Sequence, residues 1–244
     1  MRFFYLCSVE TNNDHPILVT GASNGIGYAT ALQLCKSGKK VIALSRNSVK
    51  LNQLSREAGP GCMPVKFDLQ KNKPEELLAH LSEKGIKGLR GIIHNAGYLV
   101  NKPFQSITEA DLRESYETNA FAPYRITQIL LPLLKKGAPA HVVMVSSMGG
   151  VQGSAKFEGL SAYSSSKGAL CILTECLALE LKETGIAVNC LALGAVQTEM
   201  LAQAFPGYKA PLQPEEMAGM IQWFITEGDK FFNGKIIPVA LSTP

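Results

Sequence analysis

Seven short apolar runs, rich in β-branched residues, alternate with amphipathic stretches along most of the chain. We predict strands at these runs, which are Ile17–Thr20, Val41–Ser45, Met63–Phe67, Gly91–His94, His141–Ser146, Ile186–Leu191 and Ile236–Ala240. Helical periodicity fills the intervals, at residues 25–38, 48–58, 74–84, 109–135, 161–184 and 214–227. Strands this far apart in sequence cannot pair through tight hairpins, and they need crossover connections. The pattern therefore predicts an α/β protein with a doubly wound, about seven-stranded parallel sheet and helices on both faces.

The chain has 244 residues and shows no internal repeat, low-complexity tract or linker that would divide two domains. This length suits one α/β domain, which we place at residues 17–244. Residues 1–16 stand outside the alternation, so we expect an N-terminal arm or an extra edge strand there. Apolar residues make up 46% of the chain, which is enough for a core that needs neither a disulfide nor a metal.

Charge and cysteine usage argue against several classes of function. The formal net charge of +4 is too small to indicate nucleic acid or an anionic membrane as the main partner. No apolar run is long enough to cross a membrane, and the first residues are too short for a secretory signal. The six cysteines form no C-x-x-C pair and lie at no metal-ligand spacing from a histidine. We therefore expect free thiols, no bound metal and a cytoplasmic location.

The first predicted strand runs directly into a glycine-rich segment, residues 20–27 (TGASNGIG), and helical periodicity begins at its end. Glycines let a backbone turn sharply and approach a pyrophosphate closely. The start of a helix offers free N–H groups and the positive end of the helix dipole. The segment therefore predicts a Rossmann-type nucleotide-binding site. Its cofactor-binding residues are expected to be Gly21, Ser23, Asn24, Gly25, Ile26 and Gly27.

The end of the second strand indicates which dinucleotide the site prefers. Dinucleotide folds that bind NAD carry a carboxylate here for the ribose 2′-hydroxyl, whereas an arginine accommodates a 2′-phosphate. This chain has Ser45 and Arg46 at that place, and no acidic residue occurs from His15 through Arg56. The planar guanidinium of Arg46 suits a phosphate, so we predict NADP(H) over NAD(H). Most lysines of the first two helices are interpreted as a solvated basic face.

Further motifs follow in a fixed order along the chain: Asp68-Leu69, Asn95-Ala96-Gly97, Asn119, Val145-Ser146-Ser147, Tyr163-x-x-x-Lys167 and Gly194-Ala195-Val196-Gln197-Thr198. Together with the glycine-rich segment, they make the chain resemble the short-chain dehydrogenase/reductase family from about Ile17 to Val239. The resemblance implies an NADP(H)-dependent oxidoreductase that transfers a hydride between NADPH and a carbonyl or alcohol substrate. It also implies that Asp68, Leu69, Asn95, Ala96, Gly97, Gly194, Val196 and Thr198 bind the cofactor.

Four residues are candidates for catalysis: Ser147, Tyr163, Lys167 and Asn119. Tyr163 and Lys167 are four residues apart, so a helix places them on one face. A nearby ammonium stabilises a phenolate, so we expect Lys167 to lower the pKa of Tyr163 from its usual value of about 10. The resemblance implies that Tyr163 protonates the carbonyl oxygen and that Lys167 also binds the nicotinamide ribose.

Ser147 ends the fifth strand, where ligands of open α/β sheets bind, and its hydroxyl can hydrogen-bond a substrate carbonyl. Its neighbour Ser146 is the alternative, although the family pattern places the catalytic serine second. Asn119 lies in a helical stretch shortly before Pro123, so we expect a kink there. The resemblance implies that Asn119 holds a water that connects Lys167 to solvent.

The substrate remains open between a 3-oxoacyl thioester, a ketone and similar carbonyl or alcohol compounds. Residues 148–162 and 195–214 are expected to form a mainly apolar pocket. One alternative is an NAD-linked alcohol dehydrogenase, and another is a non-catalytic dinucleotide-sensing protein on the same fold. Apolar residues occupy most of the circumference of the helix at 161–184, which predicts a second subunit and hence a homodimer or homotetramer.

Overall fold

A computed structural model describes residues 15–241. Its centre is a seven-stranded parallel sheet with the strand order β3-β2-β1-β4-β5-β6-β7. The strands are β1 (Ile17–Thr20), β2 (Val41–Ser45), β3 (Cys62–Lys66), β4 (Gly91–His94), β5 (Ala140–Ser147), β6 (Ile186–Leu193) and β7 (Ile236–Val239). The predicted parallel sheet is thereby confirmed. The predicted arm or edge strand at residues 1–16 falls almost wholly outside the described residues.

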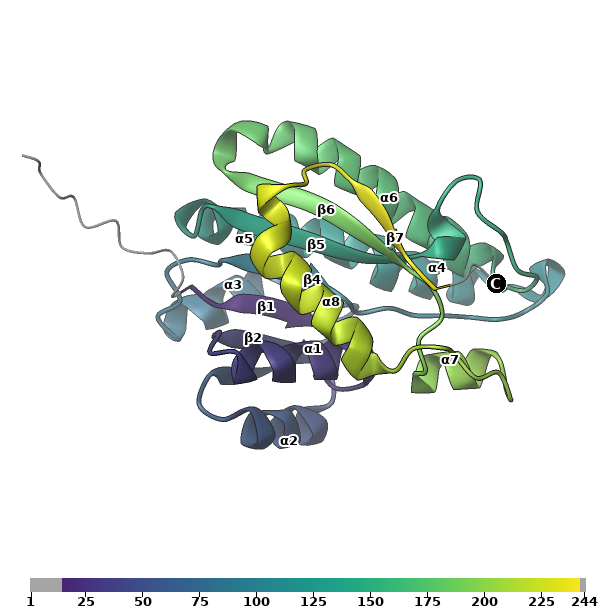
Figure 1. The fold of residues 1–244 in the computed structure, drawn as a ribbon, viewed down its shortest axis with the longest axis horizontal. Helices are drawn as coiled ribbons and strands as arrows, with labels where there is room; N and C mark the ends of the chain where they lie inside the picture. The colour runs from purple at the N-terminus through teal and green to yellow at the C-terminus, as the bar shows by residue number, and fades with distance from the viewer. Residues whose placement is uncertain (1–14, 242–244) are drawn as a thin grey trace, which may run out of the picture.

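Helices cover both faces of this sheet (Figure 1). They are α1 (Gly25–Lys36), α2 (Ser48–Ala58), α3 (Pro74–Glu83), α4 (Glu109–Tyr116), α5 (Ala122–Lys136), α6 (Ser161–Glu180), α7 (Glu199–Ala204) and α8 (Pro214–Glu227). The buried side chains of α1, α2 and α8 pack on one face, and those of α3, α5 and α6 pack on the other. The chain is thus a three-layer protein with its sheet in the middle.

The two hydrophobic cores explain why β4 carries apolar residues at consecutive positions. Ile92 and Ile93 are neighbours on β4, yet Ile92 belongs to the core under α3, α5 and α6, and Ile93 belongs to the core under α1 and α8. Successive side chains of a strand point to opposite faces. Because both faces are covered, both positions are completely buried and both must be apolar.

The predicted helix at 109–135 is divided into two helices in the structure, and Pro123 explains the position of the break. A single π-helical turn, Glu117–Phe121, separates α4 from α5. Pro123 has no N–H group, so it cannot donate the usual helical hydrogen bond to the carbonyl of Asn119. The structure therefore has a π-helical turn where the kink was predicted.

Other boundaries differ by a few residues. The third strand begins at Cys62 instead of Met63, and the helix predicted to reach residue 184 ends at Glu180, followed by a short 3₁₀ helix at Lys182–Thr184. Helix α7 was not predicted. It has six residues and none of them is buried, so it lacks the apolar periodicity by which a helix is recognised in a sequence.

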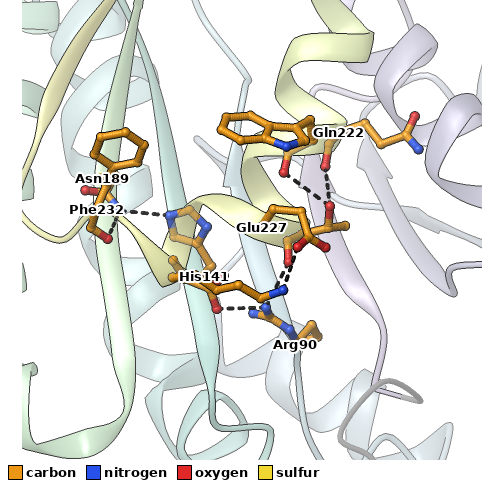
Figure 2. A network of polar contacts seen from close by, with 10 residues as sticks. Arg90, His141, Asn189, Gln222, Glu227 and Phe232 are labelled. Carbon is orange, nitrogen blue, oxygen red and sulfur yellow. Dashed lines mark hydrogen bonds and ion pairs between the residues drawn. The ribbon is translucent and has the colours of Figure 1, made fainter.

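A buried polar network lies toward the amino-terminal ends of β5 and β6, away from the carboxyl ends of the strands (Figure 2). Asn189 donates hydrogen bonds from Nδ2 to Nε2 of His141, at 3.0 Å, and to the carbonyl of Phe232, at 2.8 Å. Arg90, which directly precedes β4, forms an ion pair of 2.7 Å with Asp229. The network connects β4, β5 and β6 to the segment that follows α8.

Candidate active site

A cleft of about 710 Å³ opens at the carboxyl ends of the parallel strands. This is the edge at which open α/β sheets bind their ligands. Nearly all predicted cofactor-binding residues line the cleft: Gly21, Ser23, Asn24, Gly25, Ile26, Ser45, Arg46, Asp68, Leu69, Asn95, Ala96, Gly97, Tyr163, Lys167, Gly194, Val196 and Thr198. Ser147 lines it too. Of the predicted site residues, Gly27 and Asn119 do not line the cleft and lie behind its wall.

The glycines of the 20–27 segment are required by close packing and by backbone conformation. Gly21 has φ of +69°, and a Cβ there would lie 2.8 Å from the Cα of Ala96. A Cβ on Gly27 would lie 2.3 Å from Nδ2 of Asn95, which explains its place behind the wall. Asn95 donates to the carbonyl of Thr20 at 3.1 Å, and thereby holds the segment on β4. The result is a tightly turned backbone cradle, without side chains at positions 21, 25 and 27, that fits a pyrophosphate.

The second strand ends beside this cradle. The hydroxyl of Ser45 donates to the hydroxyl of Ser23 at 2.8 Å, and Arg46 is exposed at the rim of the cleft. Lys50, on the first turn of α2, extends its side chain to Asn24 and donates a hydrogen bond to Oδ1. Most lysines of the first two helices were interpreted as a solvated face, and Lys50 is an exception because its side chain returns to the glycine-rich segment. No sequence pattern shows in which direction a long, flexible side chain folds.

The catalytic candidates come together from two adjacent elements. Tyr163 and Lys167 lie on α6, and Ser147 ends β5. The side chains of Ser147 and Tyr163 are hydrogen-bonded to each other. The hydroxyl of Ser146 instead donates to the backbone carbonyl of Lys167 at 2.9 Å, on the buried side of α6. Of the two serines, Ser147 is therefore the one that meets Tyr163.

Burial decides the protonation of both ionisable groups here. It raises the pKa of Tyr163 above its usual range, although the hydrogen bond with Ser147 acts in the opposite direction. It lowers the pKa of Lys167 to about 8. The predicted lowering of the Tyr163 pKa by Lys167 is wrong for this structure. The Lys167 Nζ lies 5.9 Å from the centre of the tyrosine ring and donates to the carbonyl of Val145 at 2.8 Å. Tyr163 is consequently a neutral phenol at pH 7.

Asn119 is fully buried within the π-helical turn, and its side chain fastens α5 to the segment after β4. Its Nδ2 donates to the carbonyl of Tyr98 and to the hydroxyl of Ser166, each at 2.9 Å. Its Oδ1 accepts from the N–H of Tyr98 at 2.8 Å. A Cβ built on Gly97 would lie 3.6 Å from both Oδ1 of Asn119 and Nζ of Lys167, so the two side chains approach the same point beside Gly97.

Two segments enclose the end of the cleft beyond Tyr163. Met148, Phe157 and Leu160 come from the segment after β5, and Met200, Leu201, Phe205 and Tyr208 come from α7 and the residues after it. Glu199 is the charged side chain among these two segments that lines the cleft. Lys156 folds back onto its own segment, where it donates to the carbonyl of Val151 at 2.7 Å. The lining is mainly apolar, as predicted.

Residues 101 and 102 join these two segments, a role that the sequence did not reveal. Asn101 donates from Nδ2 to the carbonyl of Ala204, the last residue of α7, at 2.8 Å. The N–H of Lys102 donates to the carbonyl of Gly159 at 3.1 Å, and its ammonium group forms an ion pair of 2.7 Å with Asp111 on α4. The enclosing segments are thereby anchored to the body of the protein at one place.

Two classes of feature are absent from the part of the chain that the structure describes. Residues 15–241 contain no group of histidine, cysteine, aspartate or glutamate side chains that could hold a metal ion. Among the same residues, no helix combines the length and the apolar character needed to span a membrane.

A doubly wound parallel sheet with a glycine-rich phosphate cradle at its carboxyl edge defines a Rossmann-type dinucleotide-binding protein. Comparison with known families defines the class more narrowly. The family model for short chain dehydrogenase matches residues 15–209. The chain belongs to this family of oxidoreductases.

Individual relatives agree with this assignment. The chain is 36% identical over 201 residues to the uncharacterized oxidoreductase YciK of Escherichia coli strain K12, covering 80% of this chain and 78% of that protein. It is 36% identical over 185 residues to human L-xylulose reductase, covering 75% and 72%. A short chain dehydrogenase of Escherichia coli CFT073, solved in complex with NADPH, superimposes with a TM-score of 0.84 at 32% identity, covering 93% of this chain and 96% of that one.

Proposed function

We propose that residues 17–244 form one catalytic domain that works as an NADPH-dependent carbonyl reductase. The observation that carries the proposal is the pairing of a neutral, partly buried phenol with a serine hydroxyl at the wall of an open cleft. The glycine cradle and Arg46 line the other end of the same cleft. A related short chain dehydrogenase solved with NADPH supports this choice of cofactor.

The residues of the cleft fit a dinucleotide along its length. Gly21, Gly25 and their neighbours would hold the pyrophosphate, and Arg46 would hold the 2′-phosphate. Asp68 would bind the adenine end. Gly194, Val196, Thr198 and Lys167 would hold the nicotinamide ribose end. NADPH, when bound, supplies the hydride that reduces the carbonyl carbon.

The protein's own part is to move and hold a proton. Ser147 donates a hydrogen bond to the carbonyl oxygen and orients it, and this bond strengthens as negative charge develops on the oxygen. Tyr163 then gives its proton to that oxygen as general acid. A raised pKa suits this step, because the phenol remains protonated throughout the neutral range.

The substrate end favours a neutral, apolar carbonyl compound. Its lining is mainly apolar, and the charged group that it contributes, Glu199, would repel an anionic substrate. A ketone or quinone therefore fits better than an acyl thioester carried on an acidic protein or a phosphorylated compound.

A substrate screen tests this function. Purified protein would be given NADPH and panels of ketones, aldehydes, quinones and acyl thioesters, with NADPH oxidation followed by absorbance. We expect turnover with apolar ketones or quinones and tighter binding of NADP(H) than of NAD(H). Tighter binding of NAD(H) would favour an NAD-linked alcohol dehydrogenase. Tight NADPH binding without turnover on any panel would favour a dinucleotide-sensing protein.

We further infer a homodimer or homotetramer that uses the outer face of α6. Ile172 and Leu179 on this face are 61% and 76% exposed, and Phe121 and Tyr124 are also exposed at the start of α5. Large apolar side chains gathered on neighbouring elements favour a covered interface. Light scattering of the purified protein after size-exclusion chromatography should give the mass of a dimer or tetramer. Leu179→Glu should lower that mass, and a monomeric parent protein would contradict the inference.

The state of the cysteines bears on the cellular location, for which we propose the cytoplasm. Cys35, Cys62, Cys171 and Cys190 are buried free thiols, which favours a reducing compartment such as the cytoplasm. Fractionation of the producing cells, followed by detection of the protein, checks this. Recovery from an extracytoplasmic fraction would contradict it.

A further inference from the structure

Lys50 has an unusual position for a residue on an exposed helix. Helix α2 starts after Asn47, whose Oδ1 accepts a hydrogen bond of 3.1 Å from the backbone N–H of Lys50 and thereby fixes the first turn. The Lys50 side chain does not extend into solvent. It is half-buried, and its Nζ donates to Oδ1 of Asn24 in the glycine-rich segment. Lys50 does not itself line the cleft, but its ammonium group is held against Asn24, which does.

Arg46 supplies a second positive charge at the same place. It follows β2 directly, it is exposed, and it lines the cleft beside Ser23, Asn24 and Ser45. No ion pair within residues 15–241 involves Arg46 or Lys50. The next acidic residue in sequence, Glu57, lies on the last turn of α2, where it accepts a hydrogen bond from Gln53. Within residues 15–241, Arg46 lines the same cleft as Asn24, Lys50 is bonded to Asn24, and neither cation forms an ion pair with a carboxylate.

An ammonium group that hydrogen-bonds a neutral amide is incompletely compensated. A phosphate offers a much stronger partner, because hydrogen bonds between charged groups are about twice as strong as neutral ones. Arginine binds a phosphate through its planar fork, whereas lysine adds a compact point charge from another direction. The two side chains together can bind a dianion from two sides.

We propose that Lys50 is a second 2′-phosphate-binding residue, which selects NADP(H) over NAD(H) together with Arg46. This inference rests on the proposed NADPH dependence. When the cofactor binds, the ammonium group of Lys50 would give up its hydrogen bond to the Asn24 amide oxygen and donate to a phosphate oxygen instead. NAD(H) has a neutral hydroxyl in place of this phosphate and gains nothing from the exchange.

The alternative role for Lys50 is purely structural. Its hydrogen bond to Asn24 could serve only to fasten α2 to the glycine-rich segment. Loss of that bond would then disturb the pyrophosphate cradle and weaken both dinucleotides equally. The two roles are therefore separated by the ratio of the NADP⁺ and NAD⁺ dissociation constants, and not by either constant alone.

The test is calorimetric titration of the full-length protein with NADP⁺ and with NAD⁺. Lys50→Met removes the charge but keeps most of the apolar stem, and Lys50→Arg keeps the charge. Arg56→Met is the matched control, because it removes one positive charge from the exposed last turn of the same helix. Thermal unfolding of each variant shows whether it is folded.

We expect Lys50→Met to weaken NADP⁺ binding by about tenfold, the effect of losing one charge-assisted hydrogen bond, and to change NAD⁺ binding by less than about twofold. Lys50→Arg should restore most of the loss, and Arg56→Met should change neither constant by more than about twofold. Added salt should weaken NADP⁺ binding to the parent protein more than to Lys50→Met.

Two results would overturn the assignment while leaving the proposed function intact: an unchanged preference for NADP⁺ in Lys50→Met, or equal losses for both dinucleotides. A parent protein without any preference for NADP⁺ would overturn the proposed cofactor, and the role of Lys50 with it.

Discussion

Tyr163 shows how a single residue takes its chemical role from its surroundings. A phenol in water ionises near pH 10, and burial at the wall of the cleft moves its pKa higher still. Lys167 does not offset this shift, because its Nζ is directed to the carbonyl of Val145. The arrangement keeps the proton on Tyr163 until a substrate oxygen begins to carry negative charge. Ser147, hydrogen-bonded to the phenol, is placed to share that charge.

Tyr163→Phe keeps the ring and removes the proton donor. General acid–base groups contribute about 10²–10⁴-fold, so we expect kcat to fall by at least 10²-fold on any substrate found in the screen. NADPH affinity, measured by titration, should remain near that of the parent protein. Lys167→Ala should instead reduce both quantities, because the same ammonium would hold the ribose. A Tyr163→Phe variant with most of its turnover would show that Tyr163 is not the acid.

Motifs predict residues that act from fixed backbone positions, and they do not predict long side chains that reach across space. The spacing of Tyr163 and Lys167 places both on one helix face wherever the helix lies, and Gly21 is required by backbone geometry. These positions follow from the sequence. Lys50 does not, because its role depends on a side chain that returns to Asn24, and the identical residue could as well extend into water.

At the scale of elements, the position of helix α7 is held by contacts with other segments and hardly by its own buried side chains. None of its six residues is buried, and its first turn is capped by Thr198, whose hydroxyl accepts from the N–H of Leu201 at 3.2 Å. Its last carbonyl is held by Asn101. Met200 and Leu201, both on this helix, line the substrate end of the cleft. The position of the residues at the substrate end of the cleft therefore depends on Asn101, which lies outside α7.

We expect Asn101→Ala to loosen α7 without unfolding the protein. Removal of one hydrogen bond is worth about 1 kcal/mol, which corresponds to roughly fivefold faster hydrogen exchange for amides protected by local structure. The amides of Phe205 and Tyr208 should show this in mass spectrometry, since both are bonded within the segment. Asn52→Ala, at an exposed position of α2, is the control. Unchanged exchange in Asn101→Ala would mean that the anchor lies elsewhere.

At the scale of the whole molecule, the two edges of the sheet carry different features. The carboxyl edge carries the cleft, and the amino edge carries the buried network of Arg90, His141, Asn189 and Asp229 (Figure 2). Periodicity predicted the sheet and the helical layers because apolar runs and crossovers leave few alternatives. The polar network could not be predicted. Its members come from four separate segments, and nothing in the sequence shows that the polar residues within β5 and β6 meet those outside the strands.

Two buried histidines should make the stability of the whole molecule depend on pH. Burial lowers the pKa of His94 to about 3 and that of His141 to about 4, whereas an unfolded histidine titrates near 6.5. Below pH 6.5 the unfolded chain therefore binds more protons than the native protein, and stability falls as pH falls. Between pH 7 and pH 5 each histidine should cost about 2 kcal/mol of unfolding free energy.

Urea unfolding at pH 7 and at pH 5 measures this effect directly. The midpoint of the parent protein should be clearly lower at pH 5. His141→Asn should remove about half of the difference, because asparagine does not titrate, even if the variant is less stable than the parent at both pH values. His94→Gln should remove a similar part, since His94 is a separate buried site whose Nε2 lies 2.8 Å from the hydroxyl of Thr127. A pH difference that persists in the double variant would assign the acid sensitivity to other groups.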